Sequence, residues 1–490
     1  ILYAFFGDML PRAVKHTGFT FDVIVEHLFL LNEGVYGIPI GVATSTLFGF
    51  IMFGAFLERS KMSSIFMDLA CLLTRNSQGG PAKVAIFASA LFGTISGSAA
   101  ANVYGTGTFT IPLMKKVGYT PHFAGAVEAV PSTGGQMMPP IMGAAAFIMA
   151  DVIGVSYLTI AKAALIPSVL YYLTLLAIIH LEAVSKNMGT LPPELVPSAA
   201  SVLRRLYYLF PLVFLITILL MGRSVIACAY YGTVCIVILS MIRSETRFTF
   251  KRLCGALELS AKNAMMVSSC CACAGIIIGV ISLTGIGYKF INVITALAGS
   301  NLLLLMAMLM VTCIILGMGV PTAPAYIIVA TLGAPALMKA GVPIIAAHMF
   351  VYFYAILSVI TPPVCLAAFA GAAIAETNAM KTGVTAMKLG IVAFIIPFMF
   401  VFEPALLMQG STTEIATAFA SALIGVIGIA SGMQNWLLVR CRLWERALLL
   451  ASGLMLIFPG LITDTIGLSS LLIVLFAQRL RKGGSPVAAA

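Results

Sequence analysis

Two segments of the sequence place helix-breaking residues where their backbone groups could bind ions. The first, Ser132–Ala146, reads STGGQMMPPIMGAAA, and the second, Ile360–Ala375, reads ITPPVCLAAFAGAAIA. Proline lacks an N–H and disfavours helical geometry in the residue before it, while paired glycines let the backbone unwind. A helix interrupted in this way frees carbonyl groups that can bind a cation, and N–H groups at the restarted helix that can bind an anion. The residues expected to form these broken-helix necks are Gly134, Gly135, Pro139, Pro140, Pro362 and Pro363.

Hydroxyl and amide side chains surround both breaks, whereas charged side chains are rare there. Residues 84–150 contain two lysines and Glu128 as their only charged residues, and residues 290–375 contain a single lysine. An anionic substrate would therefore meet hydroxyls, amides and backbone N–H groups rather than a salt bridge. The residues predicted to bind it are Ser98, Thr106, Thr108, Gln136, Tyr326 and Ser358.

Some ionisable and thiol groups need a separate interpretation. Glu128 precedes the first proline pair by about three helical turns and could relay a proton or bind a cation, since an ionisable group at membrane depth is a functional candidate. Cys270, Cys271 and Cys273 have no histidine or second cysteine pair beside them, so we interpret them as packing residues. Gly275 and Gly279 have the GxxxG spacing of close helix packing.

An internal repeat organises the chain. Leu113–Lys115 and Leu337–Lys339 both read LMK, a tract of Gly, Thr and Pro precedes each, and a proline pair with a small-residue helix follows each, at an offset of about 223 residues. Prolines could simply kink packed helices. However, matched interruptions in two halves of a membrane protein indicate a transporter site near the bilayer midplane.

The composition restricts the class of protein. Hydrophobic residues make up 61% of the 490 residues and charged residues 9%, against about 25% charge in soluble domains. Apolar runs long enough to cross a bilayer include Ile38–Leu57, Leu206–Met221, Ile291–Leu316 and Leu389–Phe402. These runs do not alternate in polarity, so the fold class is an all-α polytopic membrane protein and not a barrel.

The net charge of +11 does not indicate nucleic-acid binding, because the basic residues gather in short loops. The loops Arg243–Arg252, Arg440–Arg446 and Arg479–Lys482 are expected in the cytoplasm by the positive-inside rule. The ten cysteines lie almost wholly in apolar runs and read as packed thiols.

Motifs of other function classes do not occur in the sequence. It has no GxxxxGK[ST], HExxH or GxSxG pattern, so we expect no enzyme, no nucleotide motor and no cofactor other than coupling ions. The alternatives left open are a proton-coupled version and another elevator family for dicarboxylates or other anions that works without a binding protein. A channel fits paired broken helices less well.

These segments resemble the TRAP (tripartite ATP-independent periplasmic) transporters, specifically the large membrane subunit of the TAXI branch, over about Ile1–Leu407. The matching stretches include GGPAKVAIFASALFGTISGSAAANV, TIPLMKKVGYTPHFAGAVEAVPSTGGQMMPPIMGAAAFIMAD and GMGVPTAPAYI. The resemblance implies an elevator-type secondary transporter with two inverted repeats, each with a re-entrant helical hairpin and a proline-broken helix. It further implies sodium-driven import of carboxylates across a bacterial inner membrane, with substrate delivered by a TAXI-type periplasmic binding protein.

By the same resemblance, the hairpin tips are Ser96–Thr108 and Gly317–Tyr326, and sodium lies between tip and neck. The implied sodium ligands are Ser96, Asn102, Thr133, Gly317, Thr322 and Thr361. A small membrane subunit, separate or fused ahead of the large one, is a further implied partner and is expected to be absent from or trimmed off this chain.

We expect five regions along the chain. They are scaffold helices in residues 1–80, the first repeat core in 81–180, scaffold helices and a basic loop in 181–262, the second repeat core in 263–408 and a C-terminal membrane extension in 409–490. Within the extension, Gly460–Leu468 is expected to form a short loop between two helices.

Overall fold

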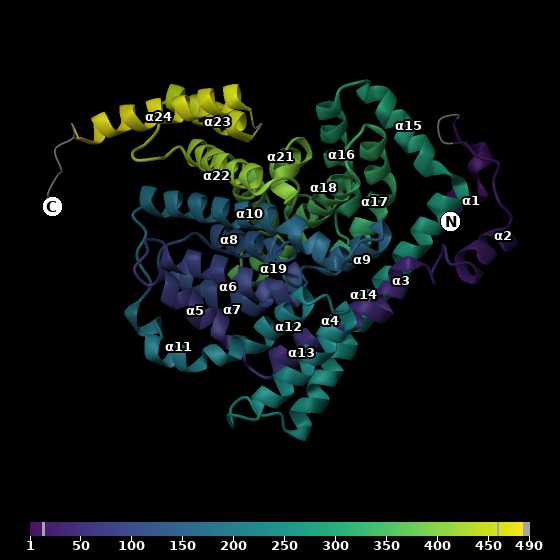
Figure 1. Ribbon diagram of the computed structural model, residues 1–490, viewed down its shortest axis with the longest axis horizontal. Helices are drawn as coiled ribbons and strands as arrows, with labels where there is room; N and C mark the ends of the chain where they lie inside the picture. The colour runs from purple at the N-terminus through teal and green to yellow at the C-terminus, as the bar shows by residue number, and fades with distance from the viewer. Residues whose placement is uncertain (12–14, 458–459, 484–490) are drawn as a thin grey trace.

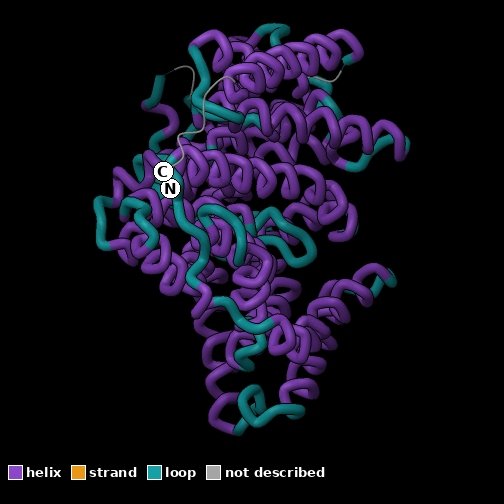
Figure 2. The backbone as a smooth tube through the Cα atoms, turned by 90° about the vertical axis from the view of Figure 1, so that its left-hand side faces the viewer, coloured by secondary structure: helices purple, strands orange, loops and turns teal. Residues whose placement is uncertain are grey.

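The computed structural model describes residues 1–11, 15–457 and 460–483, and within these ranges the chain forms helices and loops without a β-strand (Figure 2). The all-helical prediction is therefore confirmed for the described residues. The N-terminal helices are α1 (Leu2–Phe5), α2 (Phe21–Val25), α3 (Ile38–Val42), α4 (Phe48–Arg59) and α5 (Ser64–Thr74). The first group after them is α6 (Gly80–Ser96), α7 (Ala99–Lys116), α8 (Pro121–Gly134), α9 (Ala144–Ile153) and α10 (Tyr157–Ser185).

The middle of the chain contains the longest helix, α14. Its helices are α11 (Ala199–Arg205), α12 (Phe210–Leu220), α13 (Val225–Ser240), α14 (Phe250–Thr284) and α15 (Ile286–Ala298). The second group is α16 (Leu302–Gly317), α17 (Thr322–Lys339), α18 (Ile344–Leu357), α19 (Leu366–Ala375), α20 (Ala379–Leu389) and α21 (Ile396–Phe402). The C-terminal helices are α22 (Thr412–Gln434), α23 (Leu443–Ile457) and α24 (Leu461–Gly483). The prediction of a loop at Gly460–Leu468 is wrong, because the residues from Leu461 onward form the first turns of α24.

Six segments of the described chain are helical, long and apolar enough to cross a membrane. They are Ile38–Arg59, Tyr157–Ser185, Pro193–Leu220, Phe250–Thr284, Thr412–Gln434 and Ile462–Arg481. A seventh span is formed if Ala379–Leu389 and Ile391–Phe402, bent by 63° at their junction, count as one. The helices on either side of both proline pairs are shorter than a full span.

Two of the four apolar runs noted in the sequence are single spans and two are not. Ile291–Leu316 is divided between α15 and α16, because Gly299 adopts a positive φ of 58° and the side chain of Asn301 caps the new helix at the Leu304 amide. Leu389–Phe402 joins the end of α20 to a bent continuation. Hydrophobicity alone did not reveal these turns.

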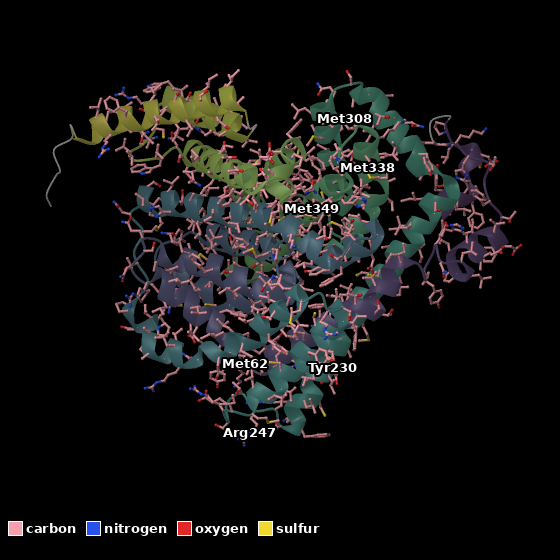
Figure 3. The ribbon with its side chains drawn as sticks, in the orientation of Figure 1. Met62, Tyr230, Arg247, Met308, Met338 and Met349 are labelled. Carbon is pink, nitrogen blue, oxygen red and sulfur yellow. The ribbon has the colours of Figure 1, made fainter. Side chains whose placement is uncertain are left out.

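The helices form a body of roughly parallel elements flanked by an oblique group (Figure 1). α6, α7, α8 and α10 lie side by side in the body, and α22 packs on α10. α4, α13 and α14 form the oblique group, in which Arg247 lies in the connection between α13 and α14 and Tyr230 lies on α13 (Figure 3). α23 and α24 form the outermost layer at the top of Figure 1.

The duplicated sequence pattern appears as a duplicated order of helices. A helix pair, α6 and α7, is followed by α8, a non-helical break and α9; the same order recurs as α16 and α17, α18, a break and α19. We call residues 135–143 the first break and residues 358–365 the second break; the second begins with the 3-10 turn Ser358–Ile360. The two groups meet where α8 crosses α19.

That crossing depends on two glycines. A Cβ atom added at Gly371 would lie 2.4 Å from the carbonyl oxygen of Gly125, and one added at Gly125 would lie 2.8 Å from the carbonyl oxygen of Gly371. The backbones of α8 and α19 therefore touch, so the helix before the first break packs directly on the helix after the second break.

Gly275 and Gly279 do form a close backbone contact, but with the loop before α3 and not with a second helix as their spacing predicts. A Cβ atom at Gly275 would lie 2.3 Å from the carbonyl oxygen of Gly34, and one at Gly279 would lie 2.8 Å from that of Glu33. The Oγ of Ser282 also donates a hydrogen bond to the Glu33 carboxylate at 2.6 Å. The loop before α3 is thus fixed directly on α14.

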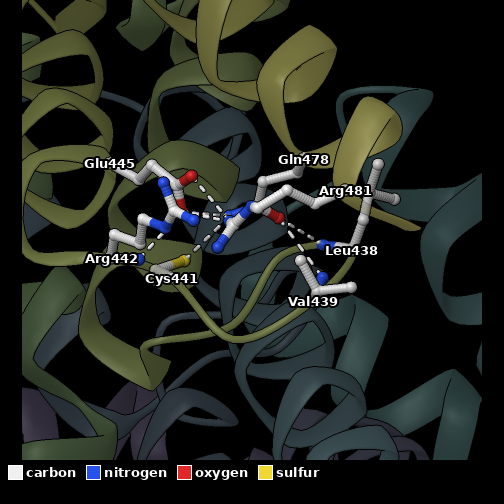
Figure 4. Close-up of polar contacts among 7 residues, drawn as sticks. All are labelled: Leu438, Val439, Cys441, Arg442, Glu445, Gln478 and Arg481. Carbon is white, nitrogen blue, oxygen red and sulfur yellow. Dashed lines mark hydrogen bonds and ion pairs between the residues drawn. The ribbon is translucent and has the colours of Figure 1, made fainter. Parts of the chain in front are cut away.

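A buried ion pair fixes the C-terminal helices to one another (Figure 4). Glu445, at the start of α23, is fully buried and lies 2.6 Å from Arg481 of α24. Gln478 donates to the same carboxylate at 3.0 Å and accepts from the amides of Leu438 and Val439. These contacts join α24 to α23 and to the preceding loop and so set the register of α24, although the Nε of Arg481 is buried without a hydrogen-bond partner among the described residues.

Candidate functional site

Hydroxyl groups from other helices donate hydrogen bonds to the backbone carbonyls of the first break. Tyr157 of α10 donates between the carbonyls of Pro140, at 2.8 Å, and Ile141. Ser168, also of α10, donates to the Met137 carbonyl at 2.7 Å. Tyr352 of α18 donates to the Gln136 carbonyl at 2.6 Å. The sequence predicts free carbonyls here, but the chain satisfies several of them itself, so fewer remain for an ion.

Removing one of these hydroxyls tests this support. Tyr157→Phe keeps the ring stacked on Phe147, with centroids 4.2 Å apart, and leaves the carbonyls of Pro140 and Ile141 without their donor. We expect a loss of about 1–3 kcal/mol in stability, measured as a lower thermal unfolding temperature in lipid nanodiscs.

A matched control comes from the same helix. Tyr172 donates to the Pro131 carbonyl at 2.8 Å, but that carbonyl also accepts from the Gly135 amide at 3.1 Å. Tyr172→Phe is therefore expected to cost less than Tyr157→Phe. An equal or larger cost would contradict the proposed role of the Tyr157 hydroxyl.

The first break contacts the first helix pair through two glycines. A Cβ atom at Gly135 would lie 2.4 Å from the Cα of Gly93, and one at Gly93 would lie 2.5 Å from the Cα of Gly135. Asn102 is buried next to this contact and donates to the Ser89 carbonyl at 2.8 Å. The Oε1 atom of Gln136, in the break, is buried and accepts no hydrogen bond from the described residues. This oxygen is available to a cation or a polar ligand.

Glu128 lies on α8, about two helical turns before the first break. Its side chain is fully buried. Its carboxylate accepts hydrogen bonds from Ser89 of α6, at 2.8 Å, and from Thr106 and Thr110 of α7. It forms no ion pair within the part of the chain that the structure describes. The carboxylate therefore ties α8 to both helices of the pair through hydroxyls alone.

The second break makes a corresponding contact with the end of α16. Ser358 donates to the carbonyl of Gly317 at 3.0 Å, and a Cβ atom at Gly317 would lie 2.7 Å from the Ser358 Oγ. Thr361 bonds back to the Leu357 carbonyl at 2.8 Å, and Thr322 is the buried first residue of α17. The structure thus brings Gly317 and Ser358 together.

A cavity of about 470 Å³ lies beside the turn between α6 and α7. Ser96 and Ser98 line it from that turn, and Ser98 caps α7 by accepting from the Ala101 amide. Parts of α4, α14 and the first break form the other walls. The first turns of α7, where the helix dipole has its positive end, lie along this wall.

A second cavity, of about 340 Å³, lies between the loop before α3, α14 and α17. Tyr326 and His348 line it, and the tyrosine hydroxyl is 2.8 Å from the histidine Nδ1. The predicted substrate residues are therefore divided: Ser98 faces the first cavity, Tyr326 the second, and Gln136 and Ser358 the breaks. They do not form one cluster.

Two predicted residues on α7 lie on opposite faces of the helix. Thr106 is buried against Glu128, whereas Thr108 is exposed and makes no contact with this group. Thr133 is buried and bonds back to the Ala129 carbonyl at 2.8 Å, and the Ser96 Oγ is 3.4 Å from the Ser98 carbonyl. The roles of these residues stay predictions.

Sequence reasoning missed several residues of the site. Ser89 contacts Glu128, Tyr157 supports the first break, and Glu58 and Asn263 line the first cavity. A polar residue on an otherwise apolar helix was the available signal for Ser89 and Tyr157. No local pattern pointed to Glu58, because it reads as a charge at a helix end.

Comparison with known proteins places most of the chain in one family. Residues 1–415 match the family described as "Tripartite ATP-independent periplasmic transporter, DctM component", and residues 415–469 match a domain of unknown function, DUF3394. The C4-dicarboxylate TRAP transporter large permease protein DctM of Pseudomonas aeruginosa is 29% identical over 143 residues, 29% of this chain and 33% of that protein.

Two further relatives carry related names. The sialic acid TRAP transporter permease protein SiaT of Haemophilus influenzae is 23% identical over 360 residues, 71% of this chain and 55% of that protein. The isethionate TRAP transporter permease protein DctMQ of Oleidesulfovibrio alaskensis is 35% identical over 91 residues, 19% of this chain and 14% of that protein. The chain spans about a third of the length of the first curated relatives that it matches.

Proposed function

Because this chain belongs to the DctM family of tripartite ATP-independent periplasmic transporter components, we propose that it is the membrane permease of a binding-protein-dependent secondary transporter. In this proposal it imports small organic anions, carboxylates, together with sodium across a bacterial inner membrane. The relatives are named for C4-dicarboxylate, isethionate and sialic acid, and we extend that class of anions to this chain. The family is one of transporters rather than enzymes.

One observation carries the proposal: each break packs against a helix pair of its own half of the chain. Gly135 touches Gly93 of the first pair, and Ser358 bonds to Gly317 of the second. Unwound backbone at membrane depth is tolerated where it is buried in protein or lines a cavity. Paired discontinuous helices in two halves of a transporter mark its binding site, and this pairing supports the proposal that ions and substrate bind at these two contacts.

We propose an elevator movement, in which the two helix pairs and broken helices form a mobile core. The oblique group of α4, α13 and α14 would be the scaffold. Both cavities support this division, since each has walls from α14 on one side and from helices next to a break on the other. The two groups of core helices would be inverted repeats with re-entrant hairpins.

Sodium is proposed to bind where the breaks meet the helix pairs. The first site would use Ser96, Asn102 and Thr133, and the second Gly317, Thr322 and Thr361. The unpartnered Oε1 of Gln136 supports the first location, because sodium takes oxygen ligands, as other hard cations do.

We propose a TAXI-type periplasmic binding protein as the partner that delivers the substrate. A small membrane subunit, separate or fused, belongs to the same proposal. The motifs around both proline pairs, which resemble the TAXI branch, support this choice of partner.

Uptake into proteoliposomes tests the proposal. The purified chain, the binding protein encoded beside it and a panel of labelled carboxylates are combined with an inward sodium gradient. We expect uptake that requires the binding protein and falls to background when choline replaces sodium at constant pH. Unchanged uptake without sodium would reject sodium coupling, and uptake without the partner would favour an elevator transporter that needs none.

A proton-coupled version is the second candidate, and Glu128 is the observation that favours it. A buried carboxylate that has only hydroxyl partners can change its protonation state without breaking an ion pair. In that case a pH gradient alone would drive uptake in the same proteoliposomes.

A further inference from the structure

A buried lysine at the start of α6 has no acidic partner. Lys83 lies in the first turns of this helix, and only 6% of the residue is exposed. Its ammonium group donates to the hydroxyl of Ser77, in the connection before α6, and to the Nδ1 atom of His180 on α10 at 3.0 Å. No described carboxylate forms an ion pair with this ammonium or is close enough to influence its charge. An ammonium that leaves water without a counter-charge is costly, and a bound anion would offset that cost.

The polar groups around Lys83 have more hydrogens to donate than the chain has acceptors for them. A neutral histidine whose Nδ1 accepts from lysine carries its proton on Nε2, and a serine oxygen that accepts a hydrogen bond still has its own proton to donate. Neither the Nε2 of His180 nor the hydroxyl of Ser77 donates to another residue within the described ranges. One proton of the Lys83 ammonium is left over as well. Such an excess of donors suits a ligand that only accepts hydrogen bonds.

Tyr119 adds a further donor beside the same segment of the chain. It lies in the connection between α7 and α8, is 4% exposed, and its hydroxyl is buried without a hydrogen-bond partner among the described residues. A Cβ atom added at Gly79 would lie 2.7 Å from this hydroxyl. The Gly79 carbonyl in turn accepts from the Lys83 amide at 3.2 Å. The Tyr119 hydroxyl and the Lys83 ammonium therefore both border the short segment Ser77–Gly79.

One acidic group lies near Tyr119. Burial, and to a smaller extent the charge of Glu182, raise the pKa of the Tyr119 hydroxyl, so this group stays protonated and able to donate. Glu182 itself forms an ion pair with Lys186, one turn further along α10. Its charge is thus already balanced by a lysine other than Lys83.

The cluster is open to the surface on one side. His180 is exposed and Ser77 is half-buried, whereas Lys83 and Tyr119 are buried. His180 also lies near the end of the apolar span Tyr157–Ser185, and the end of a membrane span is where lipid headgroups meet water. A ligand can therefore reach the cluster past His180, either from the aqueous phase or from the headgroup layer.

We propose that these four side chains bind a phosphate group, carried by free phosphate or by a lipid headgroup. They are Ser77, Lys83, Tyr119 and His180. A phosphate group presents several strong acceptor oxygens in a tetrahedral arrangement, which matches donors that come from four separate segments. Once bound, it joins the α5–α6 connection, α6, the α7–α8 connection and α10. The inference concerns a site apart from both breaks and does not rest on the proposed transport function.

Thermal unfolding of the full chain tests the site in two arms. In the first arm, phosphatidylcholine nanodiscs are titrated with sodium phosphate, and sodium chloride of equal ionic strength serves as the control. In the second arm, phosphatidylglycerol is added to the nanodiscs and no soluble phosphate is present. We expect a saturable rise in the unfolding temperature, because a ligand that binds only the folded chain stabilises it. A rise in the first arm alone identifies free phosphate, whereas a rise in the second arm that removes the response to added phosphate identifies a lipid headgroup.

Variants separate binding from folding. Tyr119→Phe removes a hydroxyl that has no partner among the described residues, so the ligand-free unfolding temperature should not fall, while about tenfold more ligand should be needed for the same response. Lys83→Met keeps an unbranched side chain but removes the charge, and should abolish the response. The matched control is Lys162→Met, which removes an exposed lysine from α10 and should keep the wild-type response.

Two results would overturn the inference. One is the absence of any rise beyond the chloride control in both arms. The other is a wild-type response in Lys83→Met or in Tyr119→Phe, because the ligand would then bind elsewhere. Neither result involves uptake, so the proposed transport function is tested separately.

Discussion

Replacing Gly135 with alanine is expected to abolish uptake, with an initial rate reduced about a hundredfold or more. The new Cβ atom would lie 2.4 Å from the Cα of Gly93, a distance that no side-chain rotation can relieve because both atoms belong to the backbone framework. The break must move away from α6, and displacement of a binding site by about 1 Å can cost two orders of magnitude in rate. Uptake into proteoliposomes measures the effect.

Two further variants make this result interpretable. Gly93→Ala approaches the same contact from the other side, at 2.5 Å, and should behave like Gly135→Ala. Gly255→Ala is the control, since this glycine lies within α14 and an added Cβ would meet no atom within 4 Å. A folded Gly135→Ala protein that transports at the wild-type rate would show that this contact is not part of the site.

The second break should tolerate the same change better. At Gly317 an added Cβ would lie 2.7 Å from the Ser358 Oγ, which can rotate away, and 2.9 Å from the Ser358 Cβ, which cannot but which is a milder overlap than the 2.4 Å contact at Gly135. Ser358 also bonds to the Ala355 carbonyl at 2.7 Å and can keep that bond when it gives up Gly317. The two repeats thus resist substitution to different degrees, although their sequences match.

The sequence predicted the interrupted helices because their cause is local. Proline pairs and glycines break a helix regardless of what surrounds them, so both breaks occur where Pro139–Pro140 and Pro362–Pro363 predict them. The side chains that bond to the breaks from other helices were less predictable. Tyr157 and Tyr352 reach the first break from α10 and α18, and the second of these lies 216 positions from the carbonyl that it contacts. No local pattern encodes such a contact.

Helix phase explains which polar residues on α7 join the site. Thr106 and Thr110 are four positions apart and share the face toward Glu128, whereas Thr108 is two positions from each and points the other way. If the whole segment had been interpreted as a helix, Thr108 would have been placed on the face opposite Thr106 and Thr110. The first cavity is different, because Glu58 and Asn263 line it from helices that only the tertiary fold brings to the α6–α7 turn.

Replacing Glu128 with leucine is expected to disrupt the core and eliminate transport. Ser89, Thr106 and Thr110 would lose their shared acceptor while remaining buried. Thr106 and Thr110 can fall back on backbone carbonyls four residues earlier, but Ser89 has only neighbouring hydroxyls, at 3.1 and 3.3 Å. Each unpaired buried hydroxyl costs about 1–3 kcal/mol, so we expect a lower unfolding temperature together with loss of uptake.

Glu128→Gln separates the structural part of this effect from the ionisable part. The amide has nearly the shape of the carboxylate, its oxygen can accept from two hydroxyls, and its NH₂ group can donate to the third after that hydroxyl rotates. The fold and a sodium-driven cycle should therefore survive, with uptake within about threefold of wild type, which corresponds to less than 1 kcal/mol. A glutamine cannot carry a proton through the cycle, so loss of pH-driven uptake in a protein of normal unfolding temperature would instead assign coupling to Glu128. Measuring both gradients on this one variant decides between the two coupling ions, because the sodium proposal places its ligands at the breaks and requires no charge at residue 128.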